Sequence, residues 1–165
     1  MKKPETLRAA IAAAVPDLAD NPDRLIMWID RGAVASPGTP SFNFTYSYRL
    51  NIFIVGYAGQ QPPVAIAILH WLRVNQPDLL QPGKDAFSFE ADFLDNKSVD
   101  LQIELQLTEC VTAIRREDGG FDMQFIAEPD PLFDDDLLPG GLDEAPALSQ
   151  IWFDGERLLP GPPLP

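Results

Sequence analysis

The sequence predicts an α+β domain, with two helices on one face of an antiparallel β-sheet, followed by an acidic, proline-rich tail. Long segments alternate apolar and polar residues with a period of two, which is typical of strands with one buried face. Two shorter segments have apolar residues at helical spacing, and the composition changes beyond Glu128. We therefore expect a folded domain over residues 1–128 and a tail over residues 129–165.

Both predicted helices begin at a proline, which the first helical turn tolerates because its missing N–H has no partner there. The first is predicted over residues 4–14, with Pro16 as its stop, and the second over residues 62–76, with Pro77 ending it. Each carries one apolar stripe that should face the sheet. The stripe residues are Leu7, Ile11 and Ala14 in the first helix, and Val64, Ile68, Trp71 and Leu72 in the second.

The predicted strands follow from alternation and from the turns between them. Residues 25–29 read as a short buried strand, and the prolines and glycine of residues 33–41 indicate a loop. Residues 42–57 read as a long strand whose even positions are buried. Of the remaining predicted strands, the first two form a hairpin around Asp95-Asn96-Lys97, and the third follows a tight turn at Asp118-Gly119-Gly120. Their ranges are 87–93, 99–107 and 121–125.

The segment beyond Glu128 has a different character, with eight prolines and the acidic run Asp134-Asp135-Asp136. Near its end, residues 151–158 predict a miniature hairpin around Asp154-Gly155. A two-stranded hairpin is marginal alone in water, so we expect this one to need a partner surface.

The formal net charge of −13 is concentrated at the carboxyl end, since residues 117–165 hold 12 acidic residues against one basic residue, a net −11. Such a chain repels phosphate backbones and anionic lipids, so neither stable nucleic-acid binding nor a membrane partner is expected. One cysteine and one histidine exclude an internal disulfide and a Cys/His zinc cluster, and they favour a reducing cytoplasm.

Few residues offer catalytic chemistry. The one imidazole, His70, lies within an apolar helix, and Cys110 ends a strand, where a lone cysteine usually acts as a small hydrophobe. Four carboxylates on one predicted hairpin face permit a glycosidase-like site, although a solvated polar face explains them equally well. They are Glu90, Asp92, Asp100 and Glu104. No phosphate-binding loop is present, and we expect no catalytic residue, cofactor or metal.

Apolar residues outside the predicted core indicate docking onto other proteins. The candidate interface residues are Trp28, Leu132, Phe133, Trp152 and Phe153, with Leu137 and Leu138 in the same tail.

Several segments in shared order resemble the phage tail-completion protein R family of temperate phages with contractile tails. The most specific is Ile68-Leu69-His70-Trp71-Leu72-Arg73-Val74-Asn75-Gln76-Pro77-Asp78. The others are Lys3 to Ala10, Asn21-Pro22-Asp23 with Ile29 to Ser36, Phe87 to Asp92, Val99 to Glu109, and Phe153-Asp154-Gly155-Glu156.

The resemblance implies a structural protein that finishes the tube and sheath at the head-proximal end of the tail and permits joining to the head. It implies a six-fold ring of identical subunits, with tube, sheath and head-completion (connector) proteins as partners. It also implies assembly in the host bacterial cytoplasm, from a phage or a prophage, and a final place in the virion tail.

Two other functions remain open from the residues alone. One is a hydrolase that uses Glu90, Asp92, Asp100 or Glu104, which requires a concave pocket with a perturbed carboxylate. The other is a monomeric adaptor whose acidic tail binds a basic partner.

Overall fold

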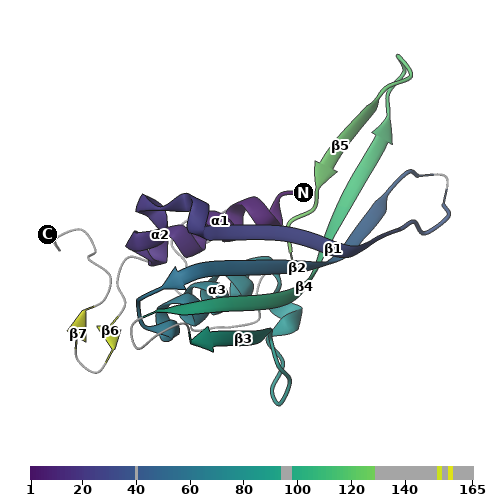
Figure 1. Ribbon diagram of the computed structural model, residues 1–165. Coiled ribbons are helices and arrows are strands. Elements are labelled where there is room, and N and C mark those ends of the chain that lie inside the picture. Colours follow the sequence, from purple (N-terminus) through teal and green to yellow (C-terminus); the bar gives the residue numbers. More distant parts are fainter. Residues whose placement is uncertain (40, 94–97, 129–151, 154–155, 158–165) are drawn as a thin grey trace, which may run out of the picture.

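The computed structural model describes residues 1–39, 41–93 and 98–128, and the backbone of 152–153 and 156–157. Within residues 1–128 it shows a five-stranded antiparallel sheet, of order β1-β2-β4-β3, with β5 paired to the far end of β4 (Figure 1). The strands are β1 (Leu25–Ala35), β2 (Phe44–Tyr57), β3 (Ser88–Phe93), β4 (Val99–Arg115) and β5 (Phe121–Phe125). The predicted α+β class is confirmed.

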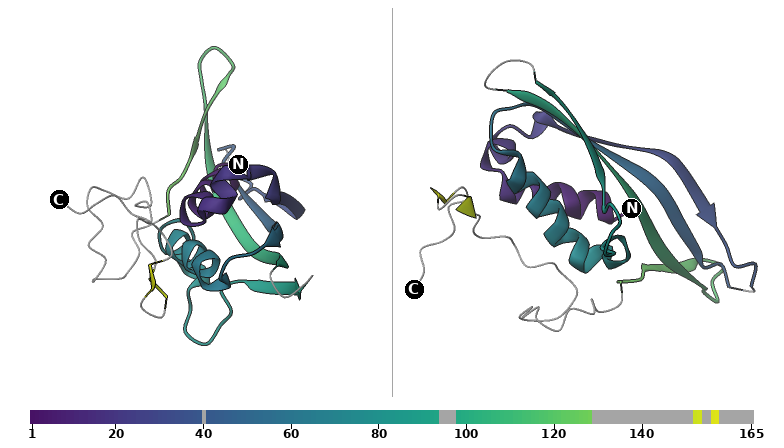
Figure 2. Two further views of the ribbon diagram at one scale, coloured as in Figure 1. Left: turned by 60° about the vertical axis from the view of Figure 1, so that its left-hand side comes forward. Right: turned by 90° about the horizontal axis from the view of Figure 1, so that it is seen from below.

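Two helices, α1 (Lys3–Ala14) and α3 (Gln61–Asn75), lie side by side on one face of the sheet (Figure 2). Their buried residues include every member of the two predicted stripes. Pro16 ends α1 as predicted, but it also begins a short helix that the sequence reading missed, because proline fits the first turn of a new helix. The short elements are α2 (Pro16–Asp20), η1 (Pro22–Arg24) and η2 (Pro77–Leu79).

The core lies between these helices and the central pair of strands, β2 and β4. Tyr48 of β2 pairs with Leu107 of β4. Leu50, Ile52 and Ile54 follow on the same face of β2, and all of these side chains are buried. The prediction for residues 42–57 is confirmed, with the strand beginning at Phe44. β4 is longer than predicted and continues to Arg115.

The prediction of a short buried strand over residues 25–29 was wrong, and the predicted loop begins after Ala35 rather than at residue 33. The strand continues to Ala35, and of its residues only Leu25 is buried. A register shift between Asp30 and Ala33 marks a bulge, where Arg31 takes the left-handed conformation with φ 50°. A bulge bends a strand and increases its twist, so the chain can pass Gly32 without leaving the sheet.

Strand β3 pairs with β4 as the predicted hairpin requires, but its apolar face is not buried. Phe89 pairs with Ile103 and Phe93 with Val99, so both point to the helix-bearing side of the sheet. They are nevertheless 60% and 76% exposed, because β3 is an edge strand and the helices do not cover them. The predicted turn at residues 95–97 lies outside the described residues.

Beyond β4 the chain turns at the predicted position. The N–H of Arg116 donates to the carbonyl of Gly120, and Gly119 has φ 88°, which favours glycine. Near the carboxyl end, β6 (Trp152–Phe153) pairs with β7 (Glu156–Arg157) in a separate two-stranded sheet, as the predicted miniature hairpin requires.

Candidate assembly surfaces

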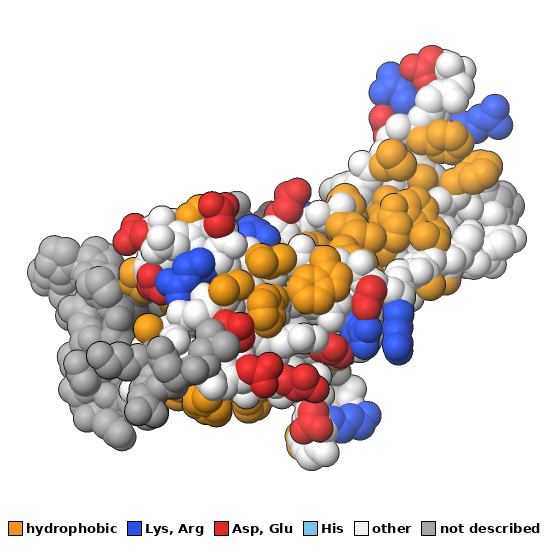
Figure 3. All heavy atoms as spheres, in the orientation of Figure 1, with side chains coloured by type: hydrophobic (Ala, Val, Ile, Leu, Met, Phe, Trp, Pro, Cys, Tyr) orange, Lys and Arg blue, Asp and Glu red, His pale blue; other side chains and the backbone are white. Residues whose placement is uncertain are grey.

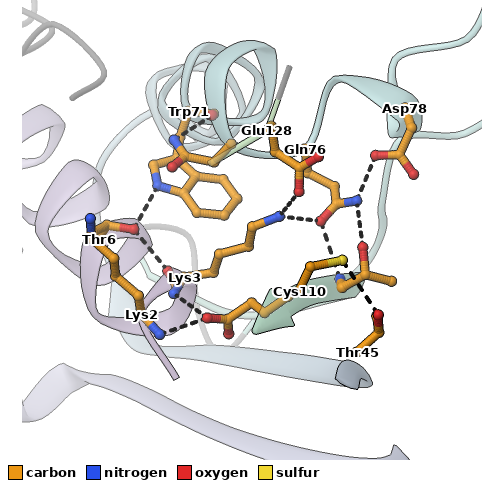
Figure 4. A network of polar contacts seen from close by, with 12 residues as sticks. Lys2, Lys3, Thr6, Thr45, Trp71, Gln76, Asp78, Cys110 and Glu128 are labelled. Atoms are coloured by element: carbon orange, nitrogen blue, oxygen red, sulfur yellow. Dashed lines mark hydrogen bonds and ion pairs between the residues drawn. The ribbon is translucent and has the colours of Figure 1, made fainter. Parts of the chain in front are cut away.

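A buried carboxylate, Glu109 on β4, binds the backbone of Lys2 and Lys3, two residues that Figure 4 labels, and so holds this segment against the sheet. Its Oε1 accepts a hydrogen bond of 2.5 Å from the hydroxyl of Tyr48. Its Oε2 accepts from the backbone N–H of Lys2 at 2.8 Å and of Lys3 at 3.5 Å. Both carboxylate oxygens therefore have partners, as a buried charge requires.

The side chain of Lys3 extends this network toward the end of α3. Its Nζ donates to Oε1 of Gln76 at 2.7 Å and to Oε1 of Glu128 at 2.5 Å. Gln76 is itself buried, and its side chain also bonds Thr108 and Asp78. One amine thus links the first helix, the end of α3 and the last residue before the segment 129–151.

The electrostatics of the network favour a structural role. Burial raises the pKa of Tyr48 far above its ordinary value, and the hydrogen bond and charge of Glu109 raise it further. A phenol in this state is a hydrogen-bond donor over the whole physiological pH range. The network therefore fixes where the ends of the domain lie.

The face of the sheet opposite the helices carries an apolar area, here named the outer patch and formed by Ile26, Trp28 and Phe53. Ile26 pairs with Phe53 across β1 and β2, and Trp28 pairs with Asn51 in the next row. Trp28 is 42% exposed. By alternation it lies on the face opposite α1 and α3, which both cover the other side of the sheet (Figure 2). Figure 3 shows hydrophobic side chains gathered over the middle of this face.

The outer patch is bordered by charge. Arg49 donates from Nε to Oδ1 of Asp30 at 2.6 Å and pairs with Glu104 at 3.2 Å. Hydrogen bonds from Arg49 hold the pKa of Asp30 at about 2. The carboxylate of Asp30 therefore stays ionised even in mildly acidic conditions.

The four candidate carboxylates lie on this same face, as alternation predicts. Asp92 is directly opposite Asp100, whose Oδ1 accepts the N–H of Gly56 at 2.7 Å. Glu90 and Asp92 are exposed and pair with no described basic residue. Figure 3 shows acidic side chains along one border of the central hydrophobic area. Among the described residues, no group of three or more His, Cys, Asp or Glu is placed to hold a metal ion.

The hairpin of β4 and β5 projects from the body and is here called the arm (Figure 1). A second exposed apolar surface includes residues of the arm, Val34 of β1 and Phe42 just before β2. Met123 pairs with Ala113 and Phe125 with Val111, so both point to one side. Phe42 packs against Phe121, with ring centroids 5.1 Å apart at 74°. We name this surface the arm face. Its members are Val34, Phe42, Phe121, Met123 and Phe125.

The predicted site residues have different outcomes. Trp28 is exposed on the sheet, whereas Leu132 and Phe133 lie outside the described residues. The backbone of Trp152 and Phe153 forms β6. Cys110 is exposed, with its Sγ 3.4 Å from Oγ1 of Thr45.

The sequence reading missed the arm face entirely. Phe121, Met123 and Phe125 alternate with polar residues, a pattern that predicts the next strand of the sheet. Alternation reveals which side is apolar, but it does not reveal whether anything covers that side.

Comparison with known proteins identifies relatives. The family model described as P2 phage tail completion protein R (GpR) matches residues 1–129. Tail completion protein R of Escherichia phage P2 is 37% identical over 134 residues, which cover 79% of this chain and 86% of that protein. No solved structure matches the chain significantly. None of the described helices is long and apolar enough to cross a membrane.

Proposed function

The chain belongs to the P2 phage tail completion protein R family, and we propose that it completes the phage tail by joining proteins, without catalysing a reaction. The observation that supports joining is the pair of exposed apolar surfaces, the outer patch and the arm face, on a small acidic domain. Exposed apolar areas rimmed by polar residues are typical of protein–protein contacts.

We propose that the protein caps the head-proximal end of a contractile tail as a ring of identical subunits, six in number. Cyclic closure is the natural way for one small domain to cap a tube. Its other partners are then the tube and sheath proteins below the ring and the head-completion protein above it. Assembly takes place in the host cytoplasm, whether the gene lies in a phage or in a prophage.

The proposed division into a domain over 1–128 and a tail over 129–165 agrees with the extent of the family match, which ends at residue 129. We propose that the tail crosses to a neighbouring subunit and docks its terminal hairpin, with Trp152 and Phe153 as anchors and Leu132 and Phe133 as further contacts. Deletion of residues 129–165 should lower the oligomer mass measured by light scattering. An unchanged mass rules out this role for the tail.

The net charge of −13 suits a ring through which DNA passes, because negative charge keeps the duplex from sticking to the subunits. The purified protein should leave duplex DNA unshifted in a gel at moderate salt. Tight binding would contradict this proposal.

A complementation assay tests the function as a whole. Heads and tails from phage lacking their completion protein are mixed with the purified chain, and infectious particles are counted. We expect joining to be restored by the full chain and not by heat-denatured chain. Unjoined heads and tails despite a folded protein would overturn the tail-completion function for this chain.

A further inference from the structure

The arm is a two-stranded extension whose apolar side is only partly covered: Phe42 packs against Phe121 and Ala113 is buried, whereas Met123 remains 67% exposed. Within the described residues, β5 pairs only with β4, and the helices lie on the body (Figure 2). A two-stranded hairpin is marginally stable by itself in water, and three or more strands or a packed helix are needed for independent stability. The arm face therefore has a physical reason to bind another surface.

The size of the arm face suits one side of a specific protein contact. From the typical areas of its three aromatic and two aliphatic side chains, it exposes on the order of 500 Å². Each partner of a standard interface buries about 800 Å², of which somewhat more than half is apolar. The apolar content of such an interface is thus present on the arm.

The outer patch offers a complementary apolar surface for the arm face. The two surfaces of one copy cannot contact each other, because they lie on opposite sides of the sheet. Val111 and Met123 belong to the helix-bearing side of the sheet by alternation, whereas Trp28 belongs to the opposite side. A contact between two different surfaces of the same chain is heterologous, and such contacts build a ring when the rotation between copies closes.

Charge also matches between the two surfaces. Arg115 pairs with Phe121 across the arm, so its side chain lies on the arm face at the outer end. Its side chain is exposed and forms no ion pair with another described residue. On the face that carries the outer patch, Glu90 and Asp92 lie on the edge strand β3, with Gln102 of β4 between Phe53 and Glu90. These two carboxylates also pair with no described basic residue. Opposite charges at matching borders fix the register of two surfaces.

We propose that the arm face of one copy packs on the outer patch of the next copy, with Arg115 against the acidic border. The inference rests on the ring of the proposed function and names the surfaces that join its subunits. The partner is a second copy of this chain, since both complementary surfaces lie on it.

A matched pair of variants tests the arm. Met123 and Ile114 are both 67% exposed on the same hairpin, but Met123 points to the arm face and Ile114 to the opposite face. Met123→Asp should weaken self-association by roughly tenfold or more, measured by native mass spectrometry across a dilution series. Ile114→Asp should leave it unchanged. Equal effects of both variants, or no effect of Met123→Asp, would overturn the proposal.

Disulfide crosslinking tests the contact directly and does not depend on variant stability. One protein carries Met123→Cys and another carries Trp28→Cys, both with Cys110→Ser because Cys110 is exposed. Oxidation of the mixture should give a two-chain product, with or without tail tubes. The matched mixture of Ile114→Cys with Trp28→Cys should give none. Absence of the product under both conditions overturns the proposal.

A single chain that carries both Met123→Cys and Trp28→Cys extends the test to the ring. It should form a ladder of crosslinked species that ends at the ring size. A crosslinked product of only two chains would support the contact between the arm face and the outer patch, but it would overturn the proposed ring. If the wild-type chain restores the joining of heads and tails but the cysteine variants give no crosslink, the proposed contact alone is overturned. If the cysteine variants give the crosslink but the wild-type chain does not restore joining, the tail-completion function alone is overturned.

Discussion

Tyr48 on β2 donates a hydrogen bond to Glu109 on β4 across 2.5 Å, and both side chains are almost wholly buried. Replacement by Tyr48→Phe should lower the free energy of unfolding by roughly 1–3 kcal/mol, because a buried carboxylate oxygen loses its donor. Urea denaturation measures the change. Tyr46→Phe is the matched control, since Tyr46 is half-buried and its hydroxyl has no described hydrogen bond. An equal loss in both variants would contradict this account.

Lys3 should stabilise the domain through its amine, whereas its neighbour Lys2 acts through its backbone alone. Lys3→Ala should cost on the order of 1 kcal/mol and should increase amide exchange near Glu128, because Gln76 and Glu128 lose their shared donor. Hydrogen-exchange mass spectrometry measures the second effect. Lys2→Ala should change neither, and matching losses would show that the amine of Lys3 has no special role.

Alkaline pH should destabilise the protein partly through Tyr57. Burial raises the pKa of Tyr57 to about 12, with a further contribution from the charge of Asp17. The unfolded chain loses this proton near pH 10, so the stabilisation is complete below pH 10 and is lost as the pH rises through about 12. Tyr57→Phe should make the pH slope of unfolding free energy shallower by about 1.4 kcal/mol per pH unit in this window. An identical slope in the wild type and the variant would contradict the assignment.

Asp30 should remain ionised at pH 3 in the folded protein, because Arg49 holds its pKa at about 2. The ion pair stabilises the fold above the ordinary carboxyl pKa of 3.8, and that contribution is lost as the pH falls through about 2. A carbon-13 NMR titration of the carboxyl group measures the pKa. Arg49→Met should return it toward 3.8, and Arg116→Met, at the tip of the arm, should not. A midpoint near 3.8 in the wild type would refute the pairing.

Local sequence signals predicted the elements that bury one clear apolar face. The helices α1 and α3 and the strand β2 fall close to their predicted ranges, and β4 begins where predicted but continues to Arg115. Prolines mark the helix ends, and alternation marks the strand faces. The core of the domain follows from these four elements.

The missed features depend on contacts distant in the sequence. Spacing cannot show that a bulge carries β1 past Gly32, or that Phe89 lies beyond the cover of the helices. Glu109 occupies an apolar position of the β4 alternation, which was a signal of burial, but its partner Lys3 lies 106 residues away. The arm face could be recognised only from the structure. Its strand has the same alternation of apolar and polar residues as a strand with a buried face, and the two differ only in whether other elements cover the apolar side.

The most direct test of the account is electron microscopy of purified tail tubes mixed with gold-labelled protein. We expect label at a single end of each tube, lost with Met123→Asp and kept with Ile114→Asp. Label along the whole tube, or no label on tubes when the protein is folded, would contradict the central claim that this protein completes the tail at its end.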